Sequence, residues 1–398
     1  MGKMCEFTFD NNISEKIRYV GVGDKEIDLF ESQYAVPHGV TYNSYVILDE
    51  KTALMDTVDL RAVDTWMQNV KEVLGQRKLD YLVIQHLEPD HSGSIGKIIE
   101  EYPDVKLVGS AKMFQMLPQF FDIPESVEKI TVAEKGTLEL GSHTLTFVMA
   151  PMVHWPEVMV SYESAEKVLF SADGFGTFGT LDEQEEDWAC EARRYYFNIV
   201  GKYGAAVQTL LKKAAALSIE TIAPLHGPVL KENLSYYIGL YDTWSSYQPE
   251  SKGVFIPYAS IHGNTAQAAE RFAEILCEKG EEKVVLCDLS RDDMAEAVED
   301  AFRYDRMVLA AASYDAGVFL CMQDFLNHLQ SKAYQNRTVG LIENGSWAPS
   351  AGRTMKATLE TMKEVHILEP MVTIRSTMKQ TDLSAMEELA EAVRNAAK

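Results

Sequence analysis

Short apolar runs, many of them ending in polar residues, mark the first 250 residues as a mixture of strands and helices. Apolar runs bounded by turn residues are typical of strands, which we expect at 42–48, 52–55, 81–85, 106–110, 137–140, 144–149, 158–162, 168–171 and 221–223. Apolar residues at helical spacing predict helices at 60–74, 95–101, 111–117 and 191–217. The pattern indicates layered sheets with helices outside them.

The pattern changes after residue 253, where predicted strands and helices alternate. Strands are expected at 254–258, 283–287, 306–312, 338–343 and 365–368, and helices at 265–279, 292–302, 319–330, 352–362 and 383–396. Such alternation is typical of a doubly wound parallel sheet with helices on both faces. The polar segment 247–253 contains a proline and ends in a glycine, so we interpret it as a linker. We therefore predict two α/β domains, 1–250 and 251–398.

Composition and charge exclude several function classes. The formal net charge is -23, and nucleic-acid partners need clustered Lys and Arg to contact phosphates. No apolar run approaches the roughly 18 residues of a membrane span, and residues 1–12 lack a secretory pattern. The five scattered cysteines contain no C-x-x-C pair, which is typical of a reducing compartment: Cys5, Cys190, Cys277, Cys287 and Cys321. We expect a cytoplasmic protein with neither a nucleic-acid nor a membrane partner.

Four ligand-capable side chains are concentrated in the segment His86-Leu87-Glu88-Pro89-Asp90-His91, which follows a predicted buried strand. His86, Glu88 and Asp90 share one parity, so extended backbone would direct all three into one cavity. Mixed imidazole and carboxylate ligands suit iron, manganese or zinc. The segment therefore predicts a metal site.

Three further ligand-capable residues, His154, Asp173 and His226, each follow a later predicted strand. Together with the first segment they supply four His, two Asp and one Glu. Seven ligands are too many for one tetrahedral metal, but they suit two metals that share a carboxylate. Asp56 also follows a strand, and we expect it to hold backbone groups near the site rather than to bind metal.

This pattern resembles the metallo-β-lactamase-like domain of flavodiiron proteins, which has His-x-Glu-x-Asp-His followed by His, Asp and His at strand ends. Hydrolases of the superfamily have His in place of Glu88, and the harder carboxylate shifts the preference from zinc towards iron. The resemblance implies an αββα sandwich that holds two irons, one bound by His86, Glu88 and His154, the other by Asp90, His91 and His226, with Asp173 bridging them. Tyr42 and Trp155 are candidates for lining this pocket or for simple aromatic packing.

The loops after three predicted strands of the second domain are candidates for binding FMN. The segment 260–265 reads Ser-Ile-His-Gly-Asn-Thr and resembles the phosphate loop of flavodoxins, although it also suits an ordinary turn and helix cap. Loops 313–317 and 344–349 would flank the flavin ring. The cofactor candidates are Ser260, His262, Gly263, Asn264, Thr265, Ser313, Tyr314, Asp315, Asn344, Gly345, Ser346 and Trp347. Trp347 departs from the common Gly-Ser-x-Gly-Trp pattern, because here the sequence is Gly-Ser-Trp-Ala-Pro.

The resemblance covers both domains in family order, and it implies a function. Electrons would pass from a separate rubredoxin-like donor, or from a reduced coenzyme, through FMN to the irons. Oxygen would be reduced to water, nitric oxide to nitrous oxide, or both. Family members form head-to-tail homodimers or dimers of dimers. Two alternatives are a zinc hydrolase fused to a flavodoxin and a non-enzymatic electron-transfer protein.

Overall fold

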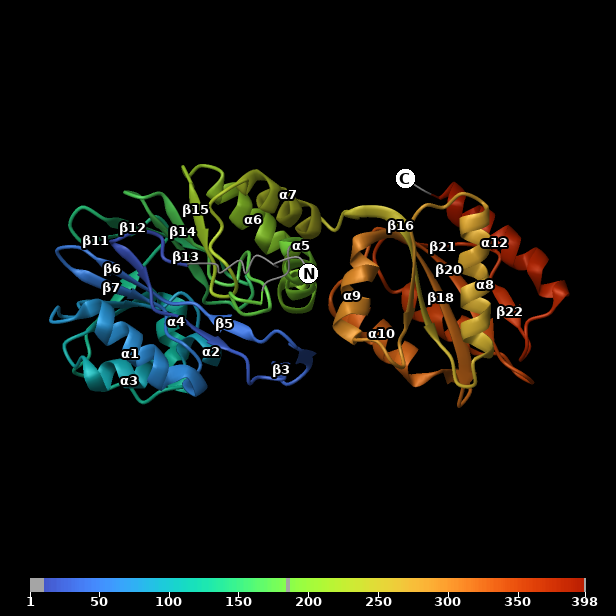
Figure 1. Cartoon of the computed structure of the whole chain (residues 1–398), viewed down its shortest axis with the longest axis horizontal. Helices are drawn as coiled ribbons and strands as arrows, with labels where there is room; N and C mark the ends of the chain where they lie inside the picture. Colours follow the sequence, from blue (N-terminus) through green and yellow to red (C-terminus); the bar gives the residue numbers. More distant parts are fainter. Residues whose placement is uncertain (1–10, 184–186, 397–398) are drawn as a thin grey trace, which may run out of the picture. The chain divides into compact units, whose positions relative to one another are not determined.

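The computed structural model describes residues 11–183 and 187–396, and the chain folds into two compact units. The first unit extends to Tyr196 and includes Ala205–Asp242, and the second comprises Phe197–Gly204 and the chain from Thr243 onward. Figure 1 labels the elements of both units. Cys5 and most of the segment 1–12 lie outside the described residues.

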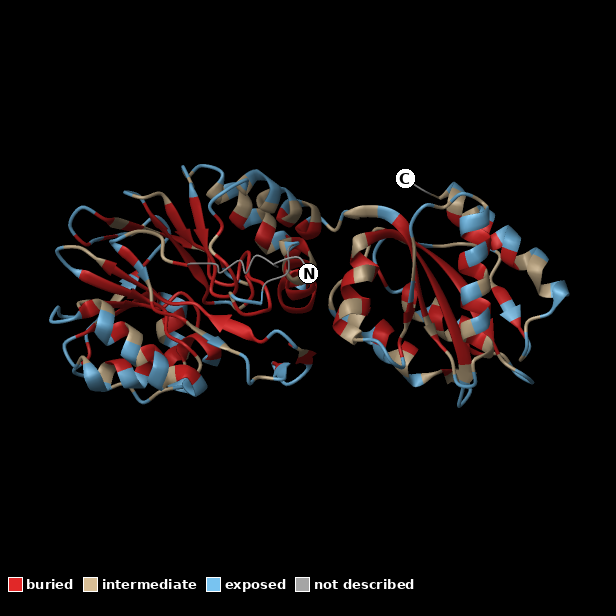
Figure 2. Ribbon diagram, viewed as in Figure 1, coloured by how far each residue is buried: buried red, intermediate tan, exposed pale blue. Residues whose placement is uncertain are grey.

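Two mixed sheets form the centre of the first unit. The six-stranded sheet has the order β1 (Ile17–Tyr19), β6 (Tyr45–Leu48), β7 (Thr52–Met55), β8 (Tyr81–Val83), β9 (Lys106–Ser110) and β10 (Lys129–Val132). The five-stranded sheet has the order β11 (Thr137–Glu139), β12 (Thr144–Met149), β13 (Met159–Glu163), β14 (Val168–Phe170) and β15 (Thr221–Ala223). Buried side chains of both sheets, such as Val83 and Phe170, form one apolar cluster, so the sheets pack face to face (Figure 2).

Helices cover the outer faces of this sandwich, as predicted (Figure 1). The helices of this part of the chain are α1 (Val63–Leu74), α2 (Pro89–Ser92), α3 (Ile95–Glu101), α4 (Ala111–Met116), α5 (Trp188–Tyr195), α6 (Gly204–Ala214) and α7 (Leu234–Ser245), of which α1 and α3 lie on one outer face and α6 and α7 on the other (Figure 1). Helix α1 buries Trp66, Val70 and Leu74, which recur every fourth residue on one face. Two small ribbons complete the unit: β2 (Val22–Asp24) with β5 (Val40–Tyr42), and β3 (Leu29–Phe30) with β4 (Tyr34–Ala35).

The predicted helical region 191–217 is helical as far as Ala214, but it is not one continuous α-helix, because the chain leaves the α-helical path between α5 and α6. A π-helical segment, Tyr196–Val200, and a 3₁₀ turn, Gly201–Tyr203, separate the two helices. The backbone at Gly204 passes so close to the carbonyl of Ser245 that a Cβ there would lie 2.4 Å from its oxygen. Apolar periodicity alone does not reveal such an approach.

The second unit is the predicted doubly wound sheet. Its strands run in parallel in the order β17 (Val284–Asp288), β16 (Ser251–Ala259), β18 (Tyr304–Tyr314), β20 (Arg337–Asn344) and β21 (Val365–Ile367). This is the flavodoxin-like order 2-1-3-4-5. The helices are α8 (Asn264–Glu278), α9 (Met294–Arg303), α10 (Leu320–Ser331), α11 (Ala351–Leu359) and α12 (Leu383–Asn395).

Two short strands of this unit were not expected. Strand β22 (Val372–Ile374) pairs with the end of β20, and β19 (Gly317–Val318) pairs with the end of β18. Strand β16 also begins at Ser251, inside the segment interpreted as a linker. Each of these short strands pairs with only one neighbouring strand, so a local pattern gives little sign of them.

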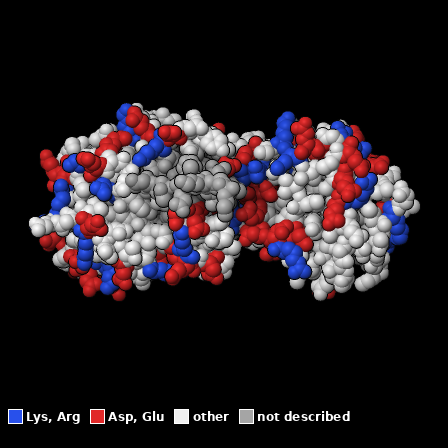
Figure 3. Space-filling model, viewed as in Figure 1, with Lys and Arg blue, Asp and Glu red and all other residues white. Residues whose placement is uncertain are grey.

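The surface agrees with the acidic composition. Figure 3 shows Asp and Glu spread over the visible face, with Lys and Arg between them. Among the described residues, no helix combines the length and the apolar character needed to cross a bilayer.

A buried histidine joins three turns at one edge of the first unit. His143 Nδ1 lies 2.8 Å from Asp49 Oδ2, and its Nε2 lies 3.2 Å from Glu166 Oε1. Burial lowers the pKa of His143, but the hydrogen bonds to Asp49 and Glu166, with the nearby charge of Glu163, outweigh burial and raise it. The pKa of Asp49 is lowered despite burial, mainly by its hydrogen bonds with His143.

We expect this contact to make stability depend on pH. The folded-state pKa of His143 lies above the unfolded value of about 6.5, so its contribution is complete below that pH and is lost as the pH rises through the folded pKa. Between pH 6 and 9, the melting temperature of wild type should therefore fall further than that of His143→Gln, by about 2–4 °C. Thermal unfolding at stepped pH measures this, and parallel curves for the two proteins would contradict it.

Candidate metal centre and flavin site

The predicted metal ligands come from loops at one edge of the sandwich. His86 and Glu88 lie between β8 and α2, and the other five are Asp90 and His91 in α2, His154 after β12, Asp173 after β14 and His226 after β15. Strands β14 and β15 are parallel neighbours, so their carboxyl ends place Asp173 and His226 side by side. All seven side chains belong to the first unit.

The first ligand group consists of His86, Glu88, His154 and one oxygen of Asp173. Glu88 Oε2 lies 3.2 Å from His86 Nε2 and 2.9 Å from His154 Nε2. Asp173 Oδ2 lies 3.1 Å from His86 Nε2 and 3.3 Å from His154 Nε2. The two imidazoles therefore point their Nε2 atoms at two carboxylates, an arrangement that can hold one metal ion.

The second ligand group consists of Asp90, His91 and His226. Asp90 Oδ2 lies 3.2 Å from Nε2 of both His91 and His226, and these two nitrogens are 3.0 Å apart. The other oxygen of Asp173, Oδ1, lies 3.3 Å from His91 Nε2. Asp173 thus presents one oxygen to each group, which is the geometry of a bridging carboxylate.

The parity expectation for the first segment is wrong at Asp90. Pro89–Ser92 forms a helical turn, with Pro89 at its first position, so the backbone is no longer extended there. Asp90 consequently joins His91 in the second ligand group, while His86 and Glu88 belong to the first. The turn divides one short segment between two metal positions.

Electrostatics and hydrogen bonding both favour cations in this cluster. Both carboxylate oxygens of Asp90 and of Asp173 are buried and accept no hydrogen bond from any described residue, although imidazole nitrogens lie within 3.3 Å. Burial opposes ionisation of Asp173, yet His86 and the other imidazoles hold its pKa well below the usual value. Burial lowers the pKa of His154, but Asp173 and Glu88 raise it to about 9. Two metal ions would satisfy these anionic oxygens and displace protons from the imidazoles.

The flavin candidates lie together in the second unit, at the carboxyl ends of β16, β18 and β20. They line a pocket of about 550 Å³, and every predicted cofactor residue except Gly263 belongs to its wall. Arg353, Ser350 and Ser376 line it as well and were not predicted. Ser376 follows the unexpected strand β22, and Arg353 lies in α11, beyond the loop that the sequence pattern singles out.

The pocket has the features that an FMN phosphate and ring require. Gly263 precedes α8 with a φ of +89°, and no side chain caps this helix, so the first amides of α8 are available for a phosphate. Gly345 packs tightly within the fourth loop, where a Cβ would lie 2.8 Å from Pro349 Cα. Tyr314 and Trp347 on the wall are 42% and 90% exposed, which leaves their aromatic faces accessible to a ring.

Comparisons with known proteins agree with this site geometry. A family described as "ODP family beta lactamase" matches residues 40–227, which contain all seven candidate ligands. A nitric oxide reductase of Moorella thermoacetica is 29% identical over 96% of this chain and 97% of its own length. A putative diflavin flavoprotein of Synechocystis sp. is 30% identical over 81% of this chain. The matched region spans only 56% of the length of that relative. The rubredoxin oxygen:oxidoreductase of Desulfovibrio gigas superposes with a TM-score of 0.89 at 26% identity, over 96% of this chain and 97% of its own.

The chain belongs to the flavodiiron protein family. Its fold is that of the family, a metallo-β-lactamase-like sandwich and a flavodoxin-like sheet. Its cofactors are accordingly FMN and a di-iron centre. The structural match extends over both units of the chain, and the candidate ligands all lie within the residues 40–227 that the family model matches.

In this flavodiiron protein, a carboxylate that the sequence analysis missed orients His86. Glu157 is buried, and its Oε1 lies 2.8 Å from His86 Nδ1 and accepts a hydrogen bond from the Leu87 amide at 2.9 Å. Such a partner fixes the tautomer and increases the basicity of a ligating imidazole. In the sequence, the sign of this role is that Glu157 lies three residues after the candidate ligand His154, in the segment His-Trp-Pro-Glu. Asp56 has the predicted structural role, because its Oδ1 accepts the Gln85 amide at 2.7 Å.

Replacing Glu157 by glutamine is expected to weaken iron binding about 10–100-fold, the usual cost of losing an outer partner of a metal ligand. The amide has no charge and can no longer hold the His86 imidazole as a carboxylate does. Competition with a chelator measures the affinity. The control is Glu163→Gln, which removes a buried carboxylate at the far end of β13 and should leave iron affinity unchanged. Equal losses in both variants would contradict the role of Glu157.

Hydrogen bonds with Thr41 fix the orientation of the candidate ligand His226 and of the backbone that follows it. The Thr41 carbonyl accepts a hydrogen bond from His226 Nδ1 at 2.6 Å, and the Thr41 hydroxyl accepts one from the Gly227 amide. Gly227 has a φ of +79°, and a Cβ there would lie 2.2 Å from Thr177 Oγ1. Only glycine therefore fits at the position after the ligand.

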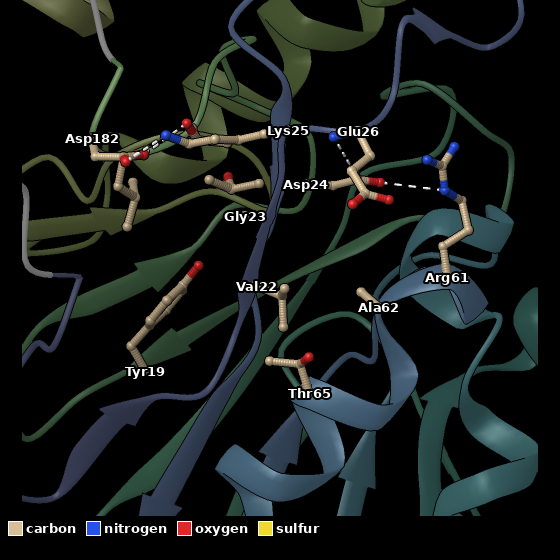
Figure 4. A pocket seen from close by; sticks show the side chains of 13 residues that line it. Tyr19, Val22, Gly23, Asp24, Lys25, Glu26, Arg61, Ala62, Thr65 and Asp182 are labelled. Atoms are coloured by element: carbon tan, nitrogen blue, oxygen red, sulfur yellow. Dashed lines mark hydrogen bonds and ion pairs between the residues drawn. The ribbon is translucent and has the colours of Figure 1, made fainter.

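The two predicted pocket aromatics, Trp155 and Tyr42, pack against ligand imidazoles. The Trp155 ring meets the His86 ring edge-on at 5.3 Å, and the Tyr42 ring lies 6.4 Å from that of His226. The Tyr42 hydroxyl donates a hydrogen bond to Asp24 at 3.2 Å. Asp24 lines a separate cavity of about 680 Å³, where it pairs with Arg61 (Figure 4). Aromatic packing is thus established for both residues, and a substrate-lining role stays a prediction.

Proposed function

We propose that this flavodiiron protein reduces oxygen to water, nitric oxide to nitrous oxide, or both. The observation that carries the proposal is Asp173, whose two oxygens face two separate ligand groups. The activities for which the relatives are named, nitric oxide reductase and rubredoxin oxygen:oxidoreductase, support both gases. Reduced FMN and two ferrous ions would together supply four electrons, the number that complete reduction of oxygen to water requires.

The protein's own residues would position these cofactors and control access to them. His86, Glu88 and His154 would hold one iron, and Asp90, His91 and His226 the other, with Asp173 keeping the pair close. Glu88 favours iron over zinc because a carboxylate is a harder ligand than an imidazole. Apart from the half-buried Glu88, these ligands are buried, which would limit the access of bulk water to the metal ions. The pocket loops after β16, β18 and β20 would hold FMN.

We infer that the electrons come from a separate rubredoxin-type protein or from a reduced coenzyme. The name of the Desulfovibrio gigas relative, rubredoxin oxygen:oxidoreductase, supports the first of these donors. The scattered cysteines also support a cytoplasmic location. Mixing the reduced protein with candidate donors and following flavin reduction by absorbance tests the assignment.

We further propose a head-to-tail homodimer in which the FMN of one subunit serves the irons of the other. This arrangement predicts that Glu88→His and Gly345→Val, each inactive alone, recover activity when their subunits are mixed. The first variant impairs the metal centre and the second distorts the flavin loop. Light scattering would establish the size of the assembly. A dimer whose mixed form stays inactive would contradict the arrangement.

An anaerobic experiment tests the function itself. Iron, zinc and FMN are quantified per chain, the protein is reduced, and oxygen or nitric oxide is added in separate stopped-flow runs. About two irons and one FMN, both reoxidised rapidly by a gas, would support the proposal. Zinc in place of iron, or flavin that reoxidises alone and releases peroxide, would overturn it.

A further inference from the structure

We propose that Arg353 is the cation that this flavin pocket presents to the FMN ring, where it stabilises the reduced, anionic flavin. This inference rests on the proposed function for the presence of FMN. It assigns to Arg353 a role in setting the redox potential, and it assigns phosphate binding to other groups of the pocket.

The charges on the pocket wall single out Arg353. Among the described residues that line it, Asp315 and Arg353 are the only Asp, Glu, Lys or Arg side chains. Arg353 lies in the first turn of α11, and its Nη2 donates a hydrogen bond to the carbonyl of Ala316 at 3.3 Å. This contact holds the guanidinium against the loop after β18, at the rim of the pocket.

The sheet order indicates which end of FMN the guanidinium faces. The phosphate loop follows β16, while the anchor Ala316 follows β18 and Arg353 follows β20. Neighbouring strands are about 4.8 Å apart, so the Arg353 side of the pocket lies one to two strand spacings from the phosphate loop. The uncapped N terminus of α8 already provides amides for the phosphate. Arg353 is therefore placed at the ring end.

The chemistry of flavin reduction gives a cation at this end a clear effect. Two electrons from the donor and one proton from water convert the neutral oxidised ring into a reduced ring with a negative charge at N1. A nearby guanidinium attracts the reduced ring more than the oxidised one, and this differential binding raises the potential. In a chain of net charge -23, with Asp315 in the same pocket, the anionic ring would otherwise be disfavoured.

The test compares Arg353→Gln and Arg353→Lys with Lys356→Gln. Lys356 is an exposed cation in the same helix that pairs with Glu369 outside the pocket wall. Dissociation constants are measured for oxidised FMN and for riboflavin, and the two-electron potential is measured by equilibration with reference dyes. Circular dichroism and thermal unfolding check that each variant is folded.

In Arg353→Gln, we expect both oxidised ligands to bind within about threefold of wild type. The affinity for reduced relative to oxidised FMN should fall at least about tenfold, which lowers the two-electron potential by about 30 mV. Arg353→Lys should recover most of this loss, and Lys356→Gln should match wild type.

Three results would overturn the proposal in different ways. Loss of FMN affinity with unchanged riboflavin affinity would assign Arg353 to the phosphate. Normal binding of both ligands with an unshifted two-electron potential would show that Arg353 only stabilises the turn at Ala316. Failure of the wild-type protein to bind FMN would overturn the proposed function, and this inference with it.

Discussion

Replacing Asp173 by asparagine is expected to remove both metal ions from the centre, and with them all gas reduction. Oδ2 of Asp173 faces His86 and His154, whereas Oδ1 faces His91. An amide is neutral and offers one acceptor oxygen, so it cannot bridge two cations. Loss of an outer partner alone costs about 10–100-fold in metal affinity, so loss of the shared ligand should cost more than about 100-fold at each position.

The measurement is iron per chain after dialysis, with FMN content and melting temperature recorded on the same sample. Asp182→Asn is the matched control, because this exposed carboxylate pairs with Lys25 away from the ligands and its loss should change neither metal content nor activity. FMN content should be unchanged in both variants. Two retained irons in Asp173→Asn, with normal gas turnover, would show that Asp173 does not bridge.

The convergence of the candidate ligands could be predicted from the sequence because local rules govern how strands end. A buried strand such as 81–85 has an apolar pattern of its own, and its loop is the place where polar side chains can converge. The same reasoning located the three flavin loops, since parallel strands bring their carboxyl ends to one edge. The doubly wound architecture followed from the alternation of strands and helices, whereas the αββα sandwich was implied by the family resemblance and the order of elements indicated only layered sheets with helices outside.

The features that the sequence did not reveal depend on tertiary contacts. Glu157 lies 71 positions after His86 along the chain, and only the packed sandwich brings the two side chains together. The helical turn at Pro89 ended the alternation along this segment, so that only the family resemblance had assigned Asp90 to the second ligand group. Arg353 and Ser376 belong to a helix and a loop outside the flavin motifs, so no local pattern marks them as pocket residues. The close approach of the Ser245 carbonyl to Gly204, at the start of α6, is likewise a contact between residues distant in the sequence.

Glu88→His is expected to convert the first metal position from an iron site into a zinc site while FMN stays bound. Glu88 contributes the carboxylate oxygen that lies 2.9 Å from His154 Nε2 and 3.2 Å from His86 Nε2. Histidine at this position would place a third imidazole beside those two, and nitrogen ligands accept zinc readily. Zinc has no redox chemistry in proteins, so the position could no longer supply electrons to a gas, and turnover should fall to the level of the metal-free protein.

Glu100→His is the matched control, because Glu100 is an exposed residue of α3 that pairs with Lys97 and lies outside both ligand groups. Both variants are purified from cultures supplied with equal iron and zinc, and metal content, FMN content and the rates with oxygen and nitric oxide are measured together. The proposal requires that Glu88→His alone gains zinc and loses both rates. FMN should stay bound in both variants, since the flavin pocket lies in the other unit. A Glu88→His protein that keeps two irons and its full rate would show that Glu88 is not a ligand, and the assignment of the first metal position would have to be withdrawn.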